Sequence, residues 1–223
     1  MSEAVGERPR LLVVAGPNGA GKTTVTEQGL RHQWFAGCEY VNPDLIAQRE
    51  LGDWNDPATV LQAARLAEER REACLRERRS LAFETVFSAP DKVDFVRRGL
   101  AAGFFVRVFF VGTDGPEINA ARVARRMLEG GHEVPIRKII DRWSRSIASA
   151  AAIAGEVDRL YVYDNSVDDR DAQLVLRASE GRVLRLYQPA GAWMAPILGG
   201  ARGGVAVRRL RRRGRPRSDR RRR

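Results

Sequence analysis

Residues 16–23 read GPNGAGKT, a complete G-x-x-x-x-G-K-T phosphate-binding loop. An apolar run at residues 11–15 precedes the loop and predicts a buried strand, while residues 22–31 predict a helix. A strand, a glycine-rich turn and a helix form the context in which this motif binds nucleotide phosphates. The sequence therefore indicates a nucleotide-binding protein, and a glycine-rich turn without a nucleotide is the alternative.

The residues of this loop have distinct expected roles in holding ATP and Mg²⁺. Glycines at positions 16, 19 and 21 let the backbone approach a ligand closely, and its N–H groups then cradle phosphate oxygens. We expect Lys22 to reach the β- and γ-phosphates and the Thr23 hydroxyl to ligate Mg²⁺. The predicted nucleotide-binding residues are Gly16, Pro17, Asn18, Gly19, Ala20, Gly21, Lys22, Thr23 and Thr24.

The formal net charge of +11 is concentrated at the C-terminal end of the chain. Residues 201–223 contain twelve Arg and one Asp, whereas residues 1–200 hold 27 basic and 27 acidic side chains. Because this tail has few large apolar residues, we predict that it is disordered and that residues 8–198 form one domain. The tail could contact nucleic acid non-specifically, or it could be a solvated extension without a partner.

Several protein classes are disfavoured by the sequence. Cys38 and Cys74 have neither metal-ligand nor redox spacing, and no apolar run is long enough to span a membrane. The N-terminus carries Glu3 and Glu7 and lacks the apolar core of a signal peptide. A cytoplasmic protein without membrane contact is therefore expected.

Apolar runs and helical periodicity alternate along the chain. Strands are predicted at 10–15, 39–41, 81–83, 104–111 and 160–163, with a hairpin from 174–177 and 182–187; helices are predicted at 22–31, 56–79, 90–101, 115–129 and 136–151. This alternation predicts a mostly parallel sheet with right-handed crossovers. The expected fold class is α/β, a three-layer sandwich of the P-loop NTPase type.

Polar residues follow the predicted strands at the edge where ligands bind in open α/β sheets. Asp44 follows the second strand and is our candidate for the general base that accepts a hydroxyl proton during phosphoryl transfer, although it could instead cap a helix. Glu84 and Thr85 end the third strand and are predicted to bind substrate together with Asn42; a solvated strand end is the alternative for Glu84.

The segment from residue 122 to residue 142 is rich in charge around a Gly130-Gly131 hinge. A mobile lid here would bring arginines over the transferring phosphate and exclude water. We assign Arg122 to nucleotide binding and Arg126 and Arg142 to catalysis; an exposed basic helix is the alternative. His132 on the hinge is assigned to substrate binding, although it could merely cap the preceding helix.

The sequence lacks a clear Walker-B aspartate. Asp114 and Asp164 each follow an apolar strand, but neither fits that motif cleanly. An ATPase motor needs a carboxylate to position the attacking water, so we favour a small-molecule phosphotransferase.

These motifs, in this order, resemble those of the zeta toxin family, especially its chromosomal zeta-like branch. The matching stretches are GPNGAGKTT at 16–24, VNPDLIA at 41–47, FETVFS at 83–88, Arg122 with Val123 and Arg126, GGHEVP at 130–135, Ile139 with Arg142, and YDNS at 163–166. The GGH-x-VP segment downstream of FET is more specific than the phosphate loop, which many protein families share.

The resemblance implies an ATP-dependent kinase that phosphorylates a hydroxyl of UDP-N-acetylglucosamine, in some members as the toxin of a toxin–antitoxin pair. It places Asp44 where the catalytic base of the family lies, and Arg126 and Arg142 at its lid arginines. Pro43 and Val86 depart from the family pattern, which expects a small residue and a second threonine there. No antitoxin-like helical domain precedes the loop, so a toxin of this kind would be held in check by a separate antitoxin chain or by weak activity of its own.

Two other functions remain open. One is a P-loop kinase acting on a different acceptor, such as a sugar, an antibiotic or a nucleotide. The other is a nucleotide-regulated module that binds nucleic acid through the basic tail.

Overall fold

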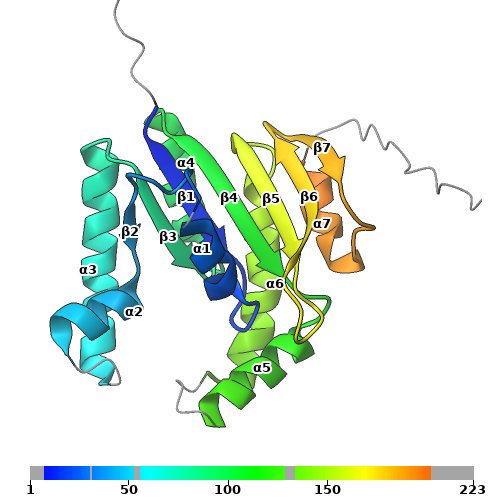
Figure 1. Ribbon diagram of the computed structural model, residues 1–223, viewed down its shortest axis with the longest axis horizontal. Coiled ribbons are helices and arrows are strands. Elements are labelled where there is room, and N and C mark those ends of the chain that lie inside the picture. Colours follow the sequence, from blue (N-terminus) through cyan, green and yellow to red (C-terminus); the bar gives the residue numbers. More distant parts are fainter. Residues whose placement is uncertain (1–7, 31, 53–55, 129–133, 202–223) are drawn as a thin grey trace, which may run out of the picture.

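The computed structural model describes residues 8–30, 32–52, 56–128 and 134–201 (Figure 1). The arginine-rich stretch from residue 202 onward lies outside the described residues, and so does the Gly130-Gly131 hinge with His132. The predictions of a disordered tail and of a hinged lid are therefore not tested by the fold.

The chain forms one seven-stranded sheet in the order β2-β3-β1-β4-β5-β6-β7. The strands are β1 (Arg10–Ala15), β2 (Glu39–Val41), β3 (Leu81–Thr85), β4 (Phe105–Gly112), β5 (Arg159–Asp164), β6 (Gln173–Ser179) and β7 (Arg182–Leu186). The first five are parallel, and β6 and β7 add an antiparallel hairpin at one edge. The prediction of a mostly parallel α/β fold is confirmed.

The helices are α1 (Lys22–Leu30), α2 (Pro43–Ile46) with a π-helical turn η1 (Ala47–Leu51), α3 (Pro57–Arg76), α4 (Pro90–Ala101), α5 (Pro116–Leu128), α6 (Ile136–Ile153) and, after the 3₁₀ turn η2 (Ala192–Met194), α7 (Ala195–Gly200). Five of the helices, α1, α3, α4, α5 and α6, lie where the sequence pattern predicts them. The Asp56 carboxylate caps α3 by accepting a hydrogen bond of 2.8 Å from the Thr59 N–H. The short helices α2 and α7 and the turn η1 were not predicted from the sequence pattern.

The two faces of the sheet are covered unequally. One face packs against α3, α4, α6 and α7 in a continuous apolar core that includes the buried Phe83, Phe110 and Met194. On the opposite face, smaller clusters form around α1 and the turn at residues 32–38, where Phe35 packs against Leu12 and Phe109. Figure 1 shows α1 on the near side of β1, whereas no helix lies in front of β5, β6 and β7. This second layer is therefore thin.

The strand order brings the candidate site together. Because β1 lies between β3 and β4, the phosphate loop that follows β1 emerges between the carboxyl ends of both neighbours. Ala15 pairs with Thr85 in the β1–β3 register, so Glu84 and Thr85 lie beside the start of the loop. None of the described helices combines the length and the apolar character needed to span a bilayer.

Candidate active site

The backbone of the phosphate loop takes a path that only glycine permits at its start and middle. Gly16 has φ +150°, and a Cβ there would lie 2.1 Å from the Val111 carbonyl oxygen. Gly19 has φ +75°, and a Cβ there would lie 2.7 Å from the Asn119 carbonyl oxygen. The Gly16 N–H also donates to the Thr85 carbonyl at 3.2 Å, which anchors the loop to β3. The loop is therefore wedged between β3, β4 and α5.

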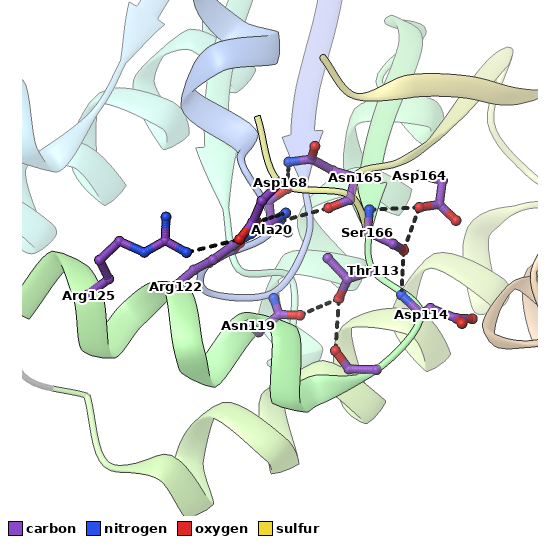
Figure 2. A network of polar contacts seen from close by, with 12 residues as sticks. Ala20, Thr113, Asp114, Asn119, Arg122, Arg125, Asp164, Asn165, Ser166 and Asp168 are labelled. Atoms are coloured by element: carbon purple, nitrogen blue, oxygen red, sulfur yellow. Dashed lines mark hydrogen bonds and ion pairs between the residues drawn. The ribbon is translucent and has the colours of Figure 1, made fainter. Parts of the chain in front are cut away.

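Side chains from two distant segments hold the carbonyl groups of the loop (Figure 2). The Asn119 side-chain amide on α5 donates to the Asn18 carbonyl, and its oxygen accepts from the Thr113 hydroxyl. The Asn165 amide, which follows β5, donates to the Ala20 carbonyl at 2.9 Å. In a trans peptide the carbonyl and the following N–H point in opposite directions. These contacts therefore turn the Gly19 and Gly21 N–H groups away from Asn119 and Asn165 and leave them for an anion.

Lys22 lies at the electrostatic centre of the candidate site. Its pKa is lowered from the ordinary value of 10.5 to about 8, mainly by burial and also by the Arg126 charge, against the opposing effect of the Glu84 and Asp44 charges. Its ammonium group donates to the Pro17 carbonyl at 3.1 Å. Groups from α1, α2, β3 and α5 thus act on one another here, although they are up to 104 positions apart in a chain of 223 residues. These groups lie near one another at the strand ends, and their roles in a site stay predictions.

A chain of hydrogen bonds links the Glu84 carboxylate to the backbone of Asp44. The Tyr40 hydroxyl donates to Glu84 Oε1 at 2.8 Å and accepts from the Asn42 side-chain amide at 3.0 Å. The Asn42 side-chain oxygen in turn accepts from the Asp44 N–H at 2.8 Å. Burial and the nearby Glu84 charge raise the pKa of Tyr40, so its hydroxyl stays protonated and able to donate. Tyr40 was not singled out by the sequence analysis.

The helix cap that was considered for Asp44 belongs to Asn42 instead. The Asn42 side chain accepts from the N–H groups of Asp44 and Leu45 at the start of α2, and Pro43 occupies the first helical position. The cap alternative for Asp44 is therefore wrong. Pro43 fits this start because its fixed φ suits the first turn, and the exposed Asp44 carboxylate lies in that turn.

The predicted arginines lie at the loop on two helices. On α5, Arg122 donates to the Asn165 carbonyl at 2.7 Å and forms a 2.7 Å ion pair with Asp168. On α6, Arg142 donates to the Asn18 side-chain oxygen at 3.2 Å. Arg126 is exposed but close enough to Lys22 to lower the pKa of the lysine. The arginines thus border the phosphate loop, and their catalytic roles stay predictions.

A cavity of about 240 Å³ opens beside the loop. It is lined by Gly19, Gly21, Arg122, Arg125, Arg126, Asn165, Asp168 and Asp169. Asp168 forms ion pairs with both Arg122 and Arg125, which lower the pKa of its carboxyl group. The cavity walls therefore combine backbone of the loop with guanidinium groups, a setting that suits a nucleotide.

The loop after β5 is organised by its own aspartate. Asp164 accepts from the Ser166 N–H at 2.8 Å and from the Trp193 indole N–H at 3.2 Å (Figure 2). The Ser166 hydroxyl accepts from the Asp114 N–H at 2.8 Å. These bonds hold the turn that carries Asn165 and Asp168 to the phosphate loop. Asp164 thus has a structural role, consistent with the lack of a clear Walker-B motif.

The remaining predicted residues have simpler surroundings. The Thr85 hydroxyl accepts from the Phe87 N–H at 3.0 Å, so it shapes the turn after β3. Thr23 and Thr24 are exposed in the first turn of α1. Among the described residues, no three His, Cys, Asp or Glu side chains are grouped to hold a metal ion. The assignment of Thr23 as a magnesium ligand stays a prediction.

Solved structures with the same fold include partners of toxin and repair systems. The complex of AvrRxo1-ORF1 and AvrRxo1-ORF2 with ATP matches at a TM-score of 0.57 and 17% identity, over 88% of this chain and 64% of that one. The PezAT chromosomal toxin–antitoxin system of Streptococcus pneumoniae matches at 0.54 and 16%, over 76% and 71%. The Pnkp1/Rnl/Hen1 RNA repair complex matches at 0.51 and 19%, over 66% and 47%.

These likenesses show a shared fold, and the chain spans less than two thirds of the AvrRxo1 chain it matches. No curated protein sequence gives a significant match. The family model for zeta toxin, in contrast, matches residues 2–180, which include the phosphate loop, both candidate carboxylates and the two arginine-bearing helices. The chain therefore belongs to the zeta toxin family.

Proposed function

We propose that the protein is an ATP-dependent kinase that transfers the γ-phosphoryl group to a hydroxyl of a small molecule. The observation that carries this proposal is the electrostatic coupling of Lys22 with Asp44, Glu84 and Arg126 at the phosphate loop. The positive charges of a lysine and an arginine can stabilise a phosphoryl group during its transfer. The two carboxylates can bind an acceptor hydroxyl and accept its proton. The kinase resemblance of the motifs agrees with this arrangement.

The nucleotide would bind along the loop and in the adjoining cavity. The Gly19 and Gly21 N–H groups face a ligand position, and the Lys22 ammonium group lies within the loop. The loop fits a polyphosphate because a Cβ at Gly16 or Gly19 would collide with neighbouring backbone. Thr23 would ligate Mg²⁺, which neutralises phosphate charge when bound. We assign the cavity beside Arg122 to the base and ribose of ATP.

The transfer step follows from the carboxylates and cations of the site. The acceptor oxygen bonds to the γ-phosphorus while the bond from that phosphorus to the β–γ bridging oxygen breaks, which releases ADP. The hydroxyl proton passes to the Asp44 carboxylate, which is exposed in the first turn of α2. Lys22, Arg126 and Arg142 stabilise the charge on the phosphoryl oxygens.

UDP-N-acetylglucosamine or a related UDP-sugar is our leading acceptor. Its support is the resemblance to the family motifs, together with the carboxylate of Glu84 and the side chain of Asn42, groups that suit sugar hydroxyls. The solved PezAT structure is described as a toxin–antitoxin system, which supports a separate antitoxin chain as a possible partner here. The rival acceptors are another sugar, an antibiotic or a nucleotide.

An acceptor screen with γ-labelled ATP tests the proposal. Label should pass to one acceptor class, with UDP-amino sugars first. Transfer only to water would make the protein an ATPase and would overturn the proposal. Transfer to a different small molecule would keep the kinase and replace the acceptor.

The variants Asp44→Asn and Asp44→Ala test the base. We expect turnover to fall about 10²- to 10⁴-fold with the affinity for ATP nearly unchanged. Asp91→Asn, which neutralises an exposed carboxylate in the first turn of α4, is the matched control and should retain full activity. Near-normal turnover in both Asp44 variants would remove Asp44 from the mechanism.

A further inference from the structure

The sheet face opposite the main core carries a row of arginines over β4, β5, β6 and β7. In the strand registers Arg107 is paired with Arg159, and Arg177 is paired with Arg185. Paired residues on neighbouring strands project from the same face. We name this surface the arginine face and define it by Arg107, Arg159, Arg177 and Arg185. In Figure 1 no labelled helix lies in front of β5, β6 and β7, three of the four strands that carry it.

Aromatic rings hold these guanidinium groups in place. The Arg107 guanidinium carbon lies 3.9 Å from the centre of the Trp34 ring, and that of Arg185 lies 4.6 Å from the Tyr187 ring. Arg159 lies over Phe105 at 5.5 Å and Arg177 over Tyr161 at 5.8 Å. A stacked guanidinium has lost much of its rotamer freedom before any ligand arrives, so a ligand pays less to fix it.

The charges of the arginine face are not balanced within the described part of the chain. None of its four arginines forms an ion pair there, and only Arg159 donates a hydrogen bond, to the Asp158 carbonyl at 2.6 Å and to the Ser179 hydroxyl. The Nε atoms of Arg107 and Arg177 are buried without a partner. Burial, Arg159, Arg10 and Arg177 all lower the pKa of Arg107.

The close pairing of these arginines is unfavourable unless an anion binds beside them. Like charges that are directly paired destabilise a sheet, and buried guanidinium atoms without acceptors lose their hydration. Residues 1–200 carry equal numbers of basic and acidic side chains. The four arginines nevertheless gather on one face without acidic partners among the described residues. An anionic ligand would supply both the missing charge and the missing acceptors.

We propose that the arginine face binds a single-stranded nucleic acid. Phosphates would contact the stacked guanidinium groups, and bases would stack on the partly exposed rings of Trp34, Phe105 and Tyr187. Three strand spacings separate β4 from β7, so the row spans about 14 Å. A face of rings and cations fits an extended strand better than a protein partner, because the cores of protein interfaces are depleted of charged residues.

The test is a salt titration of binding by the full chain. A fluorescent single-stranded RNA of uridines is followed by anisotropy for the wild type, for Arg107→Gln with Arg177→Gln, and for a control pair, Arg65→Gln with Arg145→Gln. The control removes two exposed arginines from α3 and α6, which lie away from the arginine face. Both pairs change the net charge equally, so residues 202–223 contribute the same long-range charge in each.

The proposal makes a quantitative prediction for these pairs. Each lost phosphate contact reduces the slope of log K against log salt by about 0.7 for a single strand, so the slope should fall by about 1.4 in the first pair only. The pair Arg107→Lys with Arg177→Lys keeps the charge and should keep the slope while losing affinity. If circular dichroism shows that the glutamine pair does not fold, the lysine pair tests the proposal in its place.

Three results would overturn the proposal. An unchanged slope in the first pair, or an equal change in both pairs, would assign the binding to charge elsewhere, such as the arginine-rich residues 202–223. Competition by polyglutamate as strong as that by RNA of equal charge would make an acidic polypeptide the ligand. Because the readout does not involve ATP, a failure here leaves the proposed kinase function standing.

Discussion

At the scale of single residues, Tyr40 joins the substrate side of the candidate site to the helix that carries Asp44. It donates to Glu84 at 2.8 Å and accepts from Asn42 at 3.0 Å. Tyr40→Phe removes one hydroxyl and leaves both partners without this bond, at a cost of about 1–2 kcal/mol. We predict a roughly tenfold lower kcat with an unchanged KM for ATP.

Steady-state kinetics with the identified acceptor would measure this split between kcat and KM. Tyr187→Phe is the matched control, because Tyr187 lies beyond β7 and outside the bonds around Glu84. An equal loss in both variants, or a loss confined to the KM for ATP, would contradict a positioning role for Tyr40.

The lowered pKa of Lys22 gives a second prediction at this scale. With a pKa of about 8, the lysine of the free protein is about half deprotonated at pH 8. A phosphate bound beside it favours the charged form, so ATP binding should take up about half a proton at pH 8 and much less at pH 6.5. ATP affinity should fall as the pH rises through 8, because the unbound lysine then loses its charge.

Calorimetry in buffers with different ionisation enthalpies measures that uptake. Lys22→Met keeps the length of the side chain without the titrating group, and it should show weaker binding with no such pH dependence. Proton release, or equal uptake by the variant, would contradict the assignment of the lowered pKa to Lys22.

The sequence predicted some residues of the site better than others. Lys22 and Glu84 could be placed because a motif and a strand end fix their positions, and the Glu84 charge acts on the Lys22 ammonium group, whereas the roles of both residues stay predictions. The cap of α2 was harder to assign, since Asn42 and Asp44 are both good cap residues and only the backbone decides between them. Tyr40 was missed because nothing in the sequence around a tyrosine on a short strand shows whether its hydroxyl joins two polar side chains or its ring merely packs against neighbours.

At the scale of elements, the phosphate loop depends on the turn after β5. Asn165 donates to the Ala20 carbonyl at 2.9 Å, and its amide nitrogen lies where a Cβ on Gly21 would collide. We predict that Asn165→Ala weakens ATP binding about 5- to 30-fold, since one buried carbonyl loses its donor. Asn165→Asp should weaken it further, because a carboxylate repels both the carbonyl and the phosphates.

Equilibrium binding of a fluorescent ATP analogue would rank these variants. Gln173→Ala is a suitable control, because Gln173 lies on β6 close to this turn but donates to Asp171 and not to the loop. Equal affinities for the wild type and both Asn165 variants would show that β1 and α5 fix the loop without help from the β5 turn.

Element prediction was surest where the apolar pattern was long, and a short helix was missed. The strand β4 and the helix α6 were found because each has a sustained apolar pattern. The helix α7 was missed because six residues with two glycines and a proline have low helix propensity. It is held by tertiary packing, in which Trp193, Met194 and Ile197 are buried in the main core.

At the scale of the whole molecule, ATP binding connects most of the fold. The loop contacts β3, β4, α5 and the turn after β5, so a ligand on the loop interacts with a site built from all of them. Unfolding must therefore release the ligand, and the whole domain gains the binding free energy. At a free ligand concentration of 100 Kd this gain is about 2.7 kcal/mol, or roughly 5–11 °C in Tm for a domain of this size.

Thermal unfolding of the full chain with MgATP, with MgADP and without nucleotide measures this shift. Both nucleotides should raise the Tm in a single transition, and neither should do so in Lys22→Ala with Arg122→Ala, which removes the cations at both ends of the proposed nucleotide site. Two transitions, with only one of them shifted, would mean that the loop unfolds apart from the sheet. An equal shift in the double variant would mean that the nucleotide binds elsewhere, since neither the loop lysine nor the cavity arginine would then hold it.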